Sequence, residues 1–303
     1  MQGVADPGLF PIVDLNGHTI TLNSKGIEIV ANTRSAFLTG GIITSGTNFV
    51  NARFTTHPGK VYNNIYISSV IADSDHKVGL RVTGNDAQDA GFHLKGDQSN
   101  TFTGRVEVSG QRKHLVLAKT NGAIAIRGDV FVQKRARIRF LNSNQLLKTS
   151  NISLKSYGEL QYLSNENTTN IFRNLTIEDN GIVNFIHRDR DSQKSKYYIK
   201  VDNLIINKDG HLQVQGWQEG RDFLLVRKDS TALRDALTKV SFAGYNSGNI
   251  HLEDYDSEYW SISAAPEPAM YGALFGAAGI GLWGWRKRRC RGRKTQHQMQ
   301  RRL

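Results

Sequence analysis

"NISLKSYGELQYLSNENTTNIFRNLTIEDNGIVNFI" (residues 151–186) is a run of short apolar and polar alternations separated by polar or glycine-containing turns. Alternation over four to seven positions predicts β-strands with one buried face. The step from an asparagine into alternating apolar residues occurs at Asn151 and again at Asn174. Such recurrence is typical of coils stacked one on another, in which equivalent asparagines can form ladders between coils.

Similar units extend over most of the chain. "VDLNGHTITL" (13–22) alternates on both sides of an Asn16-Gly17 turn, and "NLIINKDGHLQV" (203–214) repeats the arrangement far downstream. Short strands at regular spacing fit a β-sandwich, a β-barrel or a parallel β-helix, and the recurring Asn and Gly turns favour the last. We therefore predict an all-β fold in which residues 1–262 form a parallel β-helix, or β-solenoid. "TALRDALTK" (231–239) is the one moderate helix candidate in this body.

A family resemblance extends over about residues 11–260 of the body and is carried by residues 65–110, "NQLLKTSNISLKSYGELQYL" (144–163) and "FRNLTIEDNGIVNF" (172–185). "GFHLKGDQSNTFTGRVEVSG" (91–110), with Asn100-Thr-Phe-Thr-Gly104 inside it, resembles the autotransporter-associated β-strand repeats of bacterial surface proteins. The resemblance implies an exported β-solenoid. Charged residues replace glycines common in that family in "SGQRKHLVL" (109–117) and "VQKRARIRF" (132–140), so the register of the coils stays open.

The C-terminal segment differs from the body. In "PEPAMYGALFGAAGIGLWGWRKRR" (266–289), the 17 residues from Ala269 to Trp285 are uncharged. As a helix they would span about 25 Å, slightly less than the ~30 Å hydrocarbon core of a membrane. We predict a single C-terminal transmembrane helix at 269–285, with a cytoplasmic basic tail at 286–303 and the body outside, because positive charge follows the helix and barely precedes it.

Individual residues support the membrane assignment. Tyr271 at one end and Trp283 and Trp285 at the other occupy the positions of interfacial aromatic belts. Gly272 and Gly276 form a small face on which another membrane helix can pack, although drift towards small residues explains the pair equally well.

The order of Pro-Glu-Pro, glycine-rich apolar helix and arginine cluster resembles the PEP-CTERM sorting signal of Gram-negative surface proteins. The resemblance implies recognition by exosortase, a membrane peptidase, and cleavage near the motif. It implies first an inner-membrane anchored protein with its body outside, then a cell-surface or extracellular one. The partners implied are an exosortase-type peptidase and, transiently, the membrane. The residues concerned are the motif Pro266, Glu267 and Pro268 in a linker at 263–268, and the orientation cluster Arg286, Lys287, Arg288 and Arg289.

Charge and cysteine content narrow the possible functions. The net charge is +12, but nine of the 39 Lys and Arg residues lie in 286–303, where no acid occurs. A nucleic-acid-binding face needs its charge on the folded body, so we expect no nucleic-acid partner. Cys290, the sole cysteine, lies in the tail, which leaves the body without a disulfide or a thiolate metal site.

Catalytic chemistry has little support in the sequence. "DSDH" (73–76) and "HRDRD" (187–191) place histidine beside aspartate, but both resemble solvent-exposed turns, and we predict that His187, Asp189 and Asp191 are not catalytic. No G-x-S-x-G, H-E-x-x-H or Walker motif occurs, so we expect no cofactor, no metal site and no catalytic residue.

These observations favour a non-enzymatic exported surface or matrix protein. The alternatives are a polysaccharide-active enzyme on the same scaffold and an adhesin that binds glycans or surfaces, and a surface polysaccharide is a further candidate partner. "MQGVADPGLFPIVDLNG" (1–17) has neither the basic nor the apolar region of a signal peptide. An exported protein needs one, so we expect the true start of the chain to lie upstream.

Overall fold

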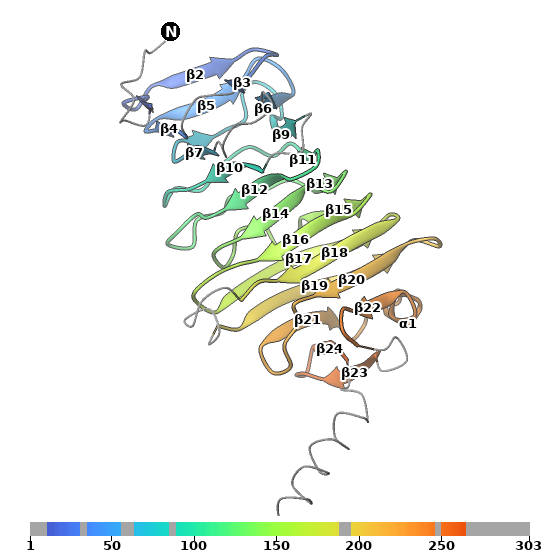
Figure 1. The fold of residues 1–303 in the computed structure, drawn as a ribbon. Coiled ribbons are helices and arrows are strands. Elements are labelled where there is room, and N and C mark those ends of the chain that lie inside the picture. The colour runs from blue at the N-terminus through green and yellow to red at the C-terminus, as the bar shows by residue number, and fades with distance from the viewer. Residues whose placement is uncertain are drawn as a thin grey trace, which may run out of the picture.

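The computed structural model describes residues 11–30, 35–55, 64–84, 89–187, 195–245 and 250–264. In these ranges the body is an all-β solenoid. Its coils stack from the N-terminal end to the C-terminal end, and the chain visits each large sheet once per coil (Figure 1). The two large sheets enclose a single hydrophobic core.

The ten-stranded sheet is parallel throughout. Its strands, in spatial order, are β1 (Ile12–Asp14), β4 (Ala36–Thr39), β7 (Asn64–Ile67), β10 (Ala90–Leu94), β12 (Lys113–Leu117), β14 (Arg137–Phe140), β16 (Gly158–Tyr162), β18 (Asn180–Phe185), β20 (His211–Gln215) and β22 (Val240–Phe242).

The eleven-stranded sheet is parallel except at its C-terminal edge. In sequence order its strands are β3 (Ile27–Val30), β6 (Phe49–Thr55), β9 (Gly79–Gly84), β11 (Val106–Ser109), β13 (Val130–Gln133), β15 (Asn151–Lys155), β17 (Thr168–Ile177), β19 (Tyr197–Ile206), β21 (Asp222–Arg227), β23 (Ile250–Asp254) and β24 (Tyr259–Ala264). A short third sheet of β2 (Thr19–Leu22), β5 (Ile42–Ser45) and β8 (Val70–Ile71) completes the first coils.

Apolar residues at the same register of successive coils form continuous rows in the core. Leu117, Phe140, Tyr162 and Phe185 pair one above another on the inner face of the ten-stranded sheet, each at most 2% exposed. The rings of Phe140 and Tyr162 stack with centroids 4.9 Å apart. Because side chains alternate between faces of a strand, these inward rows place the intervening polar residues on the outer face.

An asparagine ladder joins three coils on the eleven-stranded sheet. Asn174 Nδ2 donates to Asn151 Oδ1 at 2.8 Å, and Asn203 Nδ2 donates to Asn174 Oδ1 at 2.9 Å. Asp129 extends the row at one end, accepting from Asn151 Nδ2, and Ser230 extends it at the other, donating to Asn203 Oδ1. The predicted ladder is thus confirmed, although its members lie on strands rather than on turns.

The two ends of the solenoid differ. At the C-terminal end, β24 pairs antiparallel with β21 and β23 pairs antiparallel with β24, while helix α1 (Leu233–Leu237) buries Leu233 and Ala236. The predicted helix at 231–239 is therefore confirmed in a shorter form. At the N-terminal end, Ile12 and Val13 of β1 are 67% and 50% exposed. Strand β24 runs through Ala264 and so includes the first two residues of the predicted linker.

The corners that lead from the eleven-stranded to the ten-stranded sheet use left-handed backbone. Arg112, Arg135 and Tyr157 follow β11, β13 and β15, and their φ angles are +58°, +60° and +63°. They occupy equivalent positions in successive coils, since strands on both sides of the corner are paired in register. Non-glycine residues adopt this conformation at a cost of about 1 kcal/mol or more each.

No helix in the described ranges has the length and apolarity needed to cross a membrane. The predicted transmembrane helix at 269–285 and the basic tail at 286–303 lie outside those ranges.

Candidate functional site

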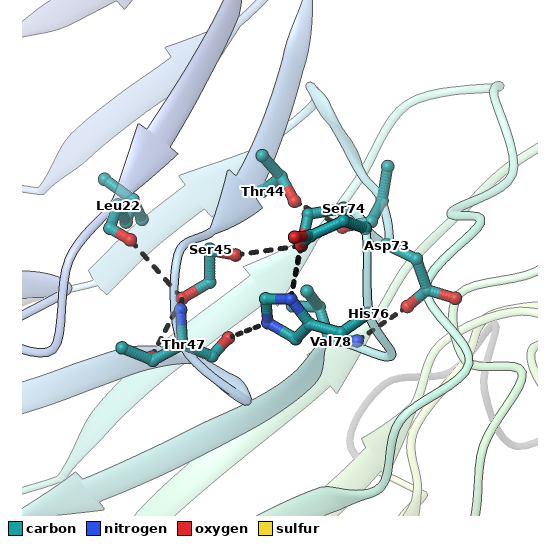
Figure 2. Close-up of polar contacts among 10 residues, drawn as sticks. Leu22, Thr44, Ser45, Thr47, Asp73, Ser74, His76 and Val78 are labelled. Carbon is teal, nitrogen blue, oxygen red and sulfur yellow. Dashed lines mark hydrogen bonds and ion pairs between the residues drawn. The ribbon is translucent and has the colours of Figure 1, made fainter.

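The Asp73–His76 turn, which the sequence singled out, braces neighbouring coils (Figure 2). The Asp73 carboxylate accepts the Val78 N–H at 2.7 Å, and from Thr103 it accepts both the backbone N–H at 3.0 Å and the hydroxyl at 2.7 Å. Partial burial opposes ionisation of Asp73, but these hydrogen bonds outweigh it and lower its pKa. Thr103 belongs to the Asn100–Gly104 motif, so Asp73 ties that motif to the coil before it.

His76 in this turn has both ring nitrogens occupied. Nε2 lies 2.9 Å from the Thr47 carbonyl oxygen, while Nδ1 lies 2.6 Å from Asp75 Oδ1 and 3.0 Å from Ser74 Oγ. The Thr47 carbonyl and the Asp75 carboxylate raise the pKa of His76. A catalytic triad needs serine and aspartate on opposite nitrogens of the imidazole. Here both meet Nδ1, so this turn is a brace and not a proton relay.

His187 forms a buried pair with Asp222. Its Nε2 lies 3.0 Å from Asp222 Oδ2, and the two side chains are 4% and 0% exposed. The ring stacks on Tyr197 with centroids 4.9 Å apart. Burial raises the pKa of Asp222 despite the hydrogen bond from His187. The expectation that residue 187 lies in a solvent-exposed turn is wrong, because Asp222 on the next coil draws its imidazole inward.

Asp189 and Asp191 lie outside the described residues. The structure places His187 against the Asp222 carboxylate of the neighbouring coil.

A larger polar cluster lies on the outer face of the ten-stranded sheet. It begins where Asp89 Oδ1 approaches His114 Nδ1 at 2.8 Å, with the His114 side chain 7% exposed. Burial opposes ionisation of Asp89, but the contact with His114 outweighs it and lowers the pKa of Asp89. The ring of His93 lies beside that of His114, and the ring of Tyr66 lies on its other side, with centroids 6.0 and 4.5 Å away.

His93 is the neutral member of this cluster. Burial, the nearby charge of His114 and the cations Lys95 and Arg139 lower the pKa of His93 to about 3. Its Nε2 is buried and has no hydrogen-bond partner. The imidazole therefore stays uncharged over the whole physiological range.

Glu159 forms the other half of the cluster. Its carboxylate accepts from Arg137 Nε at 2.9 Å, Gln161 Nε2 at 2.7 Å and Asn184 Nδ2 at 2.7 Å. Gln161 Oε1 in turn accepts two hydrogen bonds from Arg139, at 3.0 and 2.8 Å. With three donors on one carboxylate, Glu159 holds Arg137, Gln161 and Asn184 in place on the outer face.

The sequence alone did not predict this cluster. Arg137 and Arg139 alternate with Ile138, which signals an outward polar row, but Asp89 and His114 meet only because the coils stack in register. The described part of the chain holds no group of three His, Cys, Asp or Glu side chains arranged for a metal ion.

Lys119 is buried at the start of a turn on a third side of the solenoid. It is 1% exposed, its Nζ has no hydrogen-bond partner, and burial lowers its pKa to about 8. Lys119 lines a polar cavity of about 410 Å³. Asn142, Asn144 and Asn167 also line it. Because the amine is buried away from solvent, it destabilises the fold and does not serve as a binding group.

The sorting residues predicted from the sequence, Pro266 to Pro268, Ala269, Tyr271, Gly272, Gly276, Trp283, Trp285 and Arg286 to Arg289, lie outside the described ranges. These residues fall within a segment that matches a known protein-family motif. Residues 264–289 match the PEP-CTERM protein-sorting motif. The motif marks an exported surface protein that exosortase targets.

No curated protein and no solved structure matches the chain. The motif match begins at Ala264, the last residue of β24. The paired strands of the body thus end where the sorting motif starts.

Proposed function

We propose that this chain is a non-enzymatic cell-surface or matrix protein whose β-solenoid, of the autotransporter-associated repeat type, is displayed outside the cell after exosortase processing. The observation that carries the proposal is the sorting motif at 264–289, which follows the last strand without a gap. Cleavage in the Pro266–Pro268 motif leaves every described strand pair intact.

Each part of the C-terminal segment has a role in this proposal. Pro266 and Pro268 hold Glu267 in extended backbone, the conformation in which a peptidase grips its substrate. Residues 269–285 form the membrane helix, and Arg286 to Arg289 keep the tail in the cytoplasm, since charged side chains resist translocation by about 2.5–3.5 kcal/mol each. The anchored precursor has its body outside, and processing releases it to the surface.

The described polar groups support a non-enzymatic body. His76 uses both nitrogens on structural partners, and His187 is sealed against Asp222. Glu159 already has three donors, and His93 titrates far below neutral pH. His76, His187 and Glu159 are thus committed to holding coils together, and His93 stays neutral.

The test is expression of the full chain, preceded by an export signal, in a bacterium that has an exosortase. Mass spectrometry of the mature protein should place the C-terminus near residues 265–268. Replacement of Pro266, Glu267 and Pro268 by alanine should leave the tail attached and the protein in the membrane fraction. A matched control replaces Gln296, His297 and Gln298 by alanine, beyond the matched motif, and should be processed normally. A wild-type chain that keeps its tail through Leu303 contradicts the proposal, because the segment is then an anchor alone.

A polysaccharide-active enzyme is the second candidate, favoured by the pairing of Asp89 with His114 beside Glu159 on one sheet face. It predicts release of reducing ends from a polysaccharide and loss of that release in His114→Ala. The non-enzymatic proposal predicts no release by either protein.

A further inference from the structure

A column of large side chains runs along one corner of the solenoid. Arg112, Arg135 and Tyr157 hold equivalent left-handed positions in three successive coils, and Lys134, also left-handed at φ +57°, lies next to Arg135. Coils in a solenoid are spaced as neighbouring strands are, about 4.8 Å apart. We call Arg112, Lys134, Arg135 and Tyr157 the corner ladder.

The charges of the corner ladder are available to a ligand. Arg112, Lys134 and Arg135 are exposed, and Tyr157 is 49% exposed. Among the residues that the structure describes, none of the three cations forms an ion pair or a side-chain hydrogen bond. The guanidinium carbon of Arg135 lies 5.6 Å from the centroid of the Tyr157 ring.

Neighbouring acids are already occupied. Glu178 lies 3.4 Å from Lys155, and Asp179 accepts backbone N–H groups from Ser156 and Asn180. Asp89, one coil before Arg112, contacts His114, so among the described residues none of these three acids pairs with a cation of the ladder.

The backbone conformation of the ladder residues is a second indication of a functional site. Glycine is the residue that adopts positive φ without a steric penalty. Gly110 and Ser156 also have positive φ at these corners, but the four ladder residues place long side chains in this conformation. Strained positions that retain a costly side chain in successive coils are typical of functional sites. All four residues have left-handed backbone, and three of them also carry an unpaired charge, which is an independent observation.

We propose that the corner ladder binds a linear acidic polysaccharide that lies along the solenoid axis. Arg112 and Arg135 pair with carboxylates of sugars one coil apart, and Lys134 adds a positive charge beside Arg135. Guanidinium groups suit carboxylates because they bind them in bidentate fashion. Tyr157 offers an apolar ring face on which a sugar ring packs. The inference deepens the proposed surface function, because such polymers are met outside the cell, but the binding itself needs no export or processing.

The ladder fits this ligand better than a membrane or a nucleic acid. It is a single column at one corner rather than a broad basic face, whereas a lipid surface needs a broad face. A single-stranded nucleic acid is held by a groove that tracks its backbone with several aromatic rings, and the ladder has one such ring. Both alternatives are outcomes of the experiment.

The test uses the full chain purified in a nonionic detergent and immobilised polygalacturonate, with dextran as the neutral control. The wild-type protein should bind polygalacturonate and not dextran. The triple variant R112G/K134G/R135G should bind at least about tenfold more weakly. Because glycine relieves the left-handed strain, this variant should unfold at the same temperature as the wild type or higher, so lost binding is not lost folding.

A charge-matched variant separates a site from general electrostatics. Lys77, Lys148 and Lys196 are exposed and precede β9, β15 and β19, at the opposite ends of the strands from the ladder, and K77Q/K148Q/K196Q removes the same charge. It should weaken binding by less than about threefold. Tyr157→Ala should weaken binding to polygalacturonate but not to polyphosphate, which has no sugar ring.

Three results overturn the proposal: absence of binding by the wild type, an equal loss in both triple variants, or tighter binding to phosphatidylglycerol vesicles or single-stranded DNA than to polygalacturonate. None of these affects the processing experiment, so the two proposals fail separately.

Discussion

Asn174 uses its side-chain amide in both directions, donating to Asn151 on the coil before it and accepting from Asn203 on the coil after it. Parallel pairing in register brings identical side chains one coil apart, so each amide meets a copy of itself. The ladder adds side-chain hydrogen bonds to those of the backbone and penalises any slip of register.

Asn174→Ala should lower the free energy of unfolding by about 1–3 kcal/mol, because it leaves the Asn151 oxygen and the Asn203 amide without their partner. Urea unfolding followed by circular dichroism measures the change. Asn165→Ala, in an exposed turn, is the matched control and should change stability by less than about 0.5 kcal/mol. Equal effects of the two substitutions would show that the ladder is not stabilising.

Lys119→Met should stabilise the protein at neutral pH. The pKa of Lys119 falls from its ordinary value of 10.5 to about 8 because the amine is buried, and this difference corresponds to about 3 kcal/mol of destabilisation when the group is charged. Methionine fills a similar volume without a charge. Urea unfolding at pH 7 should show the gain, and Lys148→Met, at an exposed position, should show none.

The same substitution has a defined pH dependence. The unfolded chain binds the Lys119 proton more tightly than the folded one, so wild-type stability rises as pH increases from about 8 to 10.5. The advantage of Lys119→Met should therefore be complete below pH 8 and should shrink towards zero as pH approaches 10.5. An advantage that is constant over this window would show that the amine is not buried as a charged group.

Asp73→Ala should cost about 1–3 kcal/mol at neutral pH, because its carboxylate accepts hydrogen bonds from Val78 and Thr103. The folded-state pKa of Asp73 is lowered, so its contribution is complete above the ordinary value of 3.8 and is lost as pH falls below it. Thermal unfolding at pH 7 and below pH 3 should show the difference between wild type and variant closing. Asp209→Ala at an exposed turn should be close to neutral at both.

Arg135→Gly and Arg135→Ala separate backbone strain from side-chain contacts. Both remove the contact with Tyr157, but only glycine adopts φ near +60° without penalty. The glycine variant should be about 1 kcal/mol more stable than the alanine variant in urea unfolding. Alanine matching glycine would mean that the corner is not left-handed in solution.

The sequence predicted the solenoid because its alternation and its Asn and Gly turns recur coil by coil. "NISL" and "NLTI" start at Asn151 and Asn174, which meet directly in the structure, and Asn16-Gly17 forms the expected turn with positive φ at both residues. That turn is a corner between sheets rather than a hairpin, since β1 and β2 pair with different strands. The Asn-Gly motif determines where the chain bends. Which strands pair, however, depends on residues about one coil away in the sequence.

The polar clusters were less predictable for the same reason. The local sequence places His187 in a charged loop, yet its partner Asp222 lies 35 residues downstream. Asp89 meets His114 and Arg137 meets Glu159 only when coils of unequal length stack in register. Left-handed φ at Arg112 and Arg135 gave no sequence signal, because arginine is not a residue type that indicates this conformation.

The antiparallel hairpin of β23 and β24 gives the solenoid a fixed terminus beside the sorting motif. Between Arg137 and Glu159 one coil takes 22 residues, and between Ser156 and Asp179 it takes 23. A gene can therefore gain or lose whole coils in the interior by duplication or deletion, since each coil contacts mainly its neighbours. The length of the displayed rod can evolve in steps of one coil while the segment read by the export machinery stays unchanged.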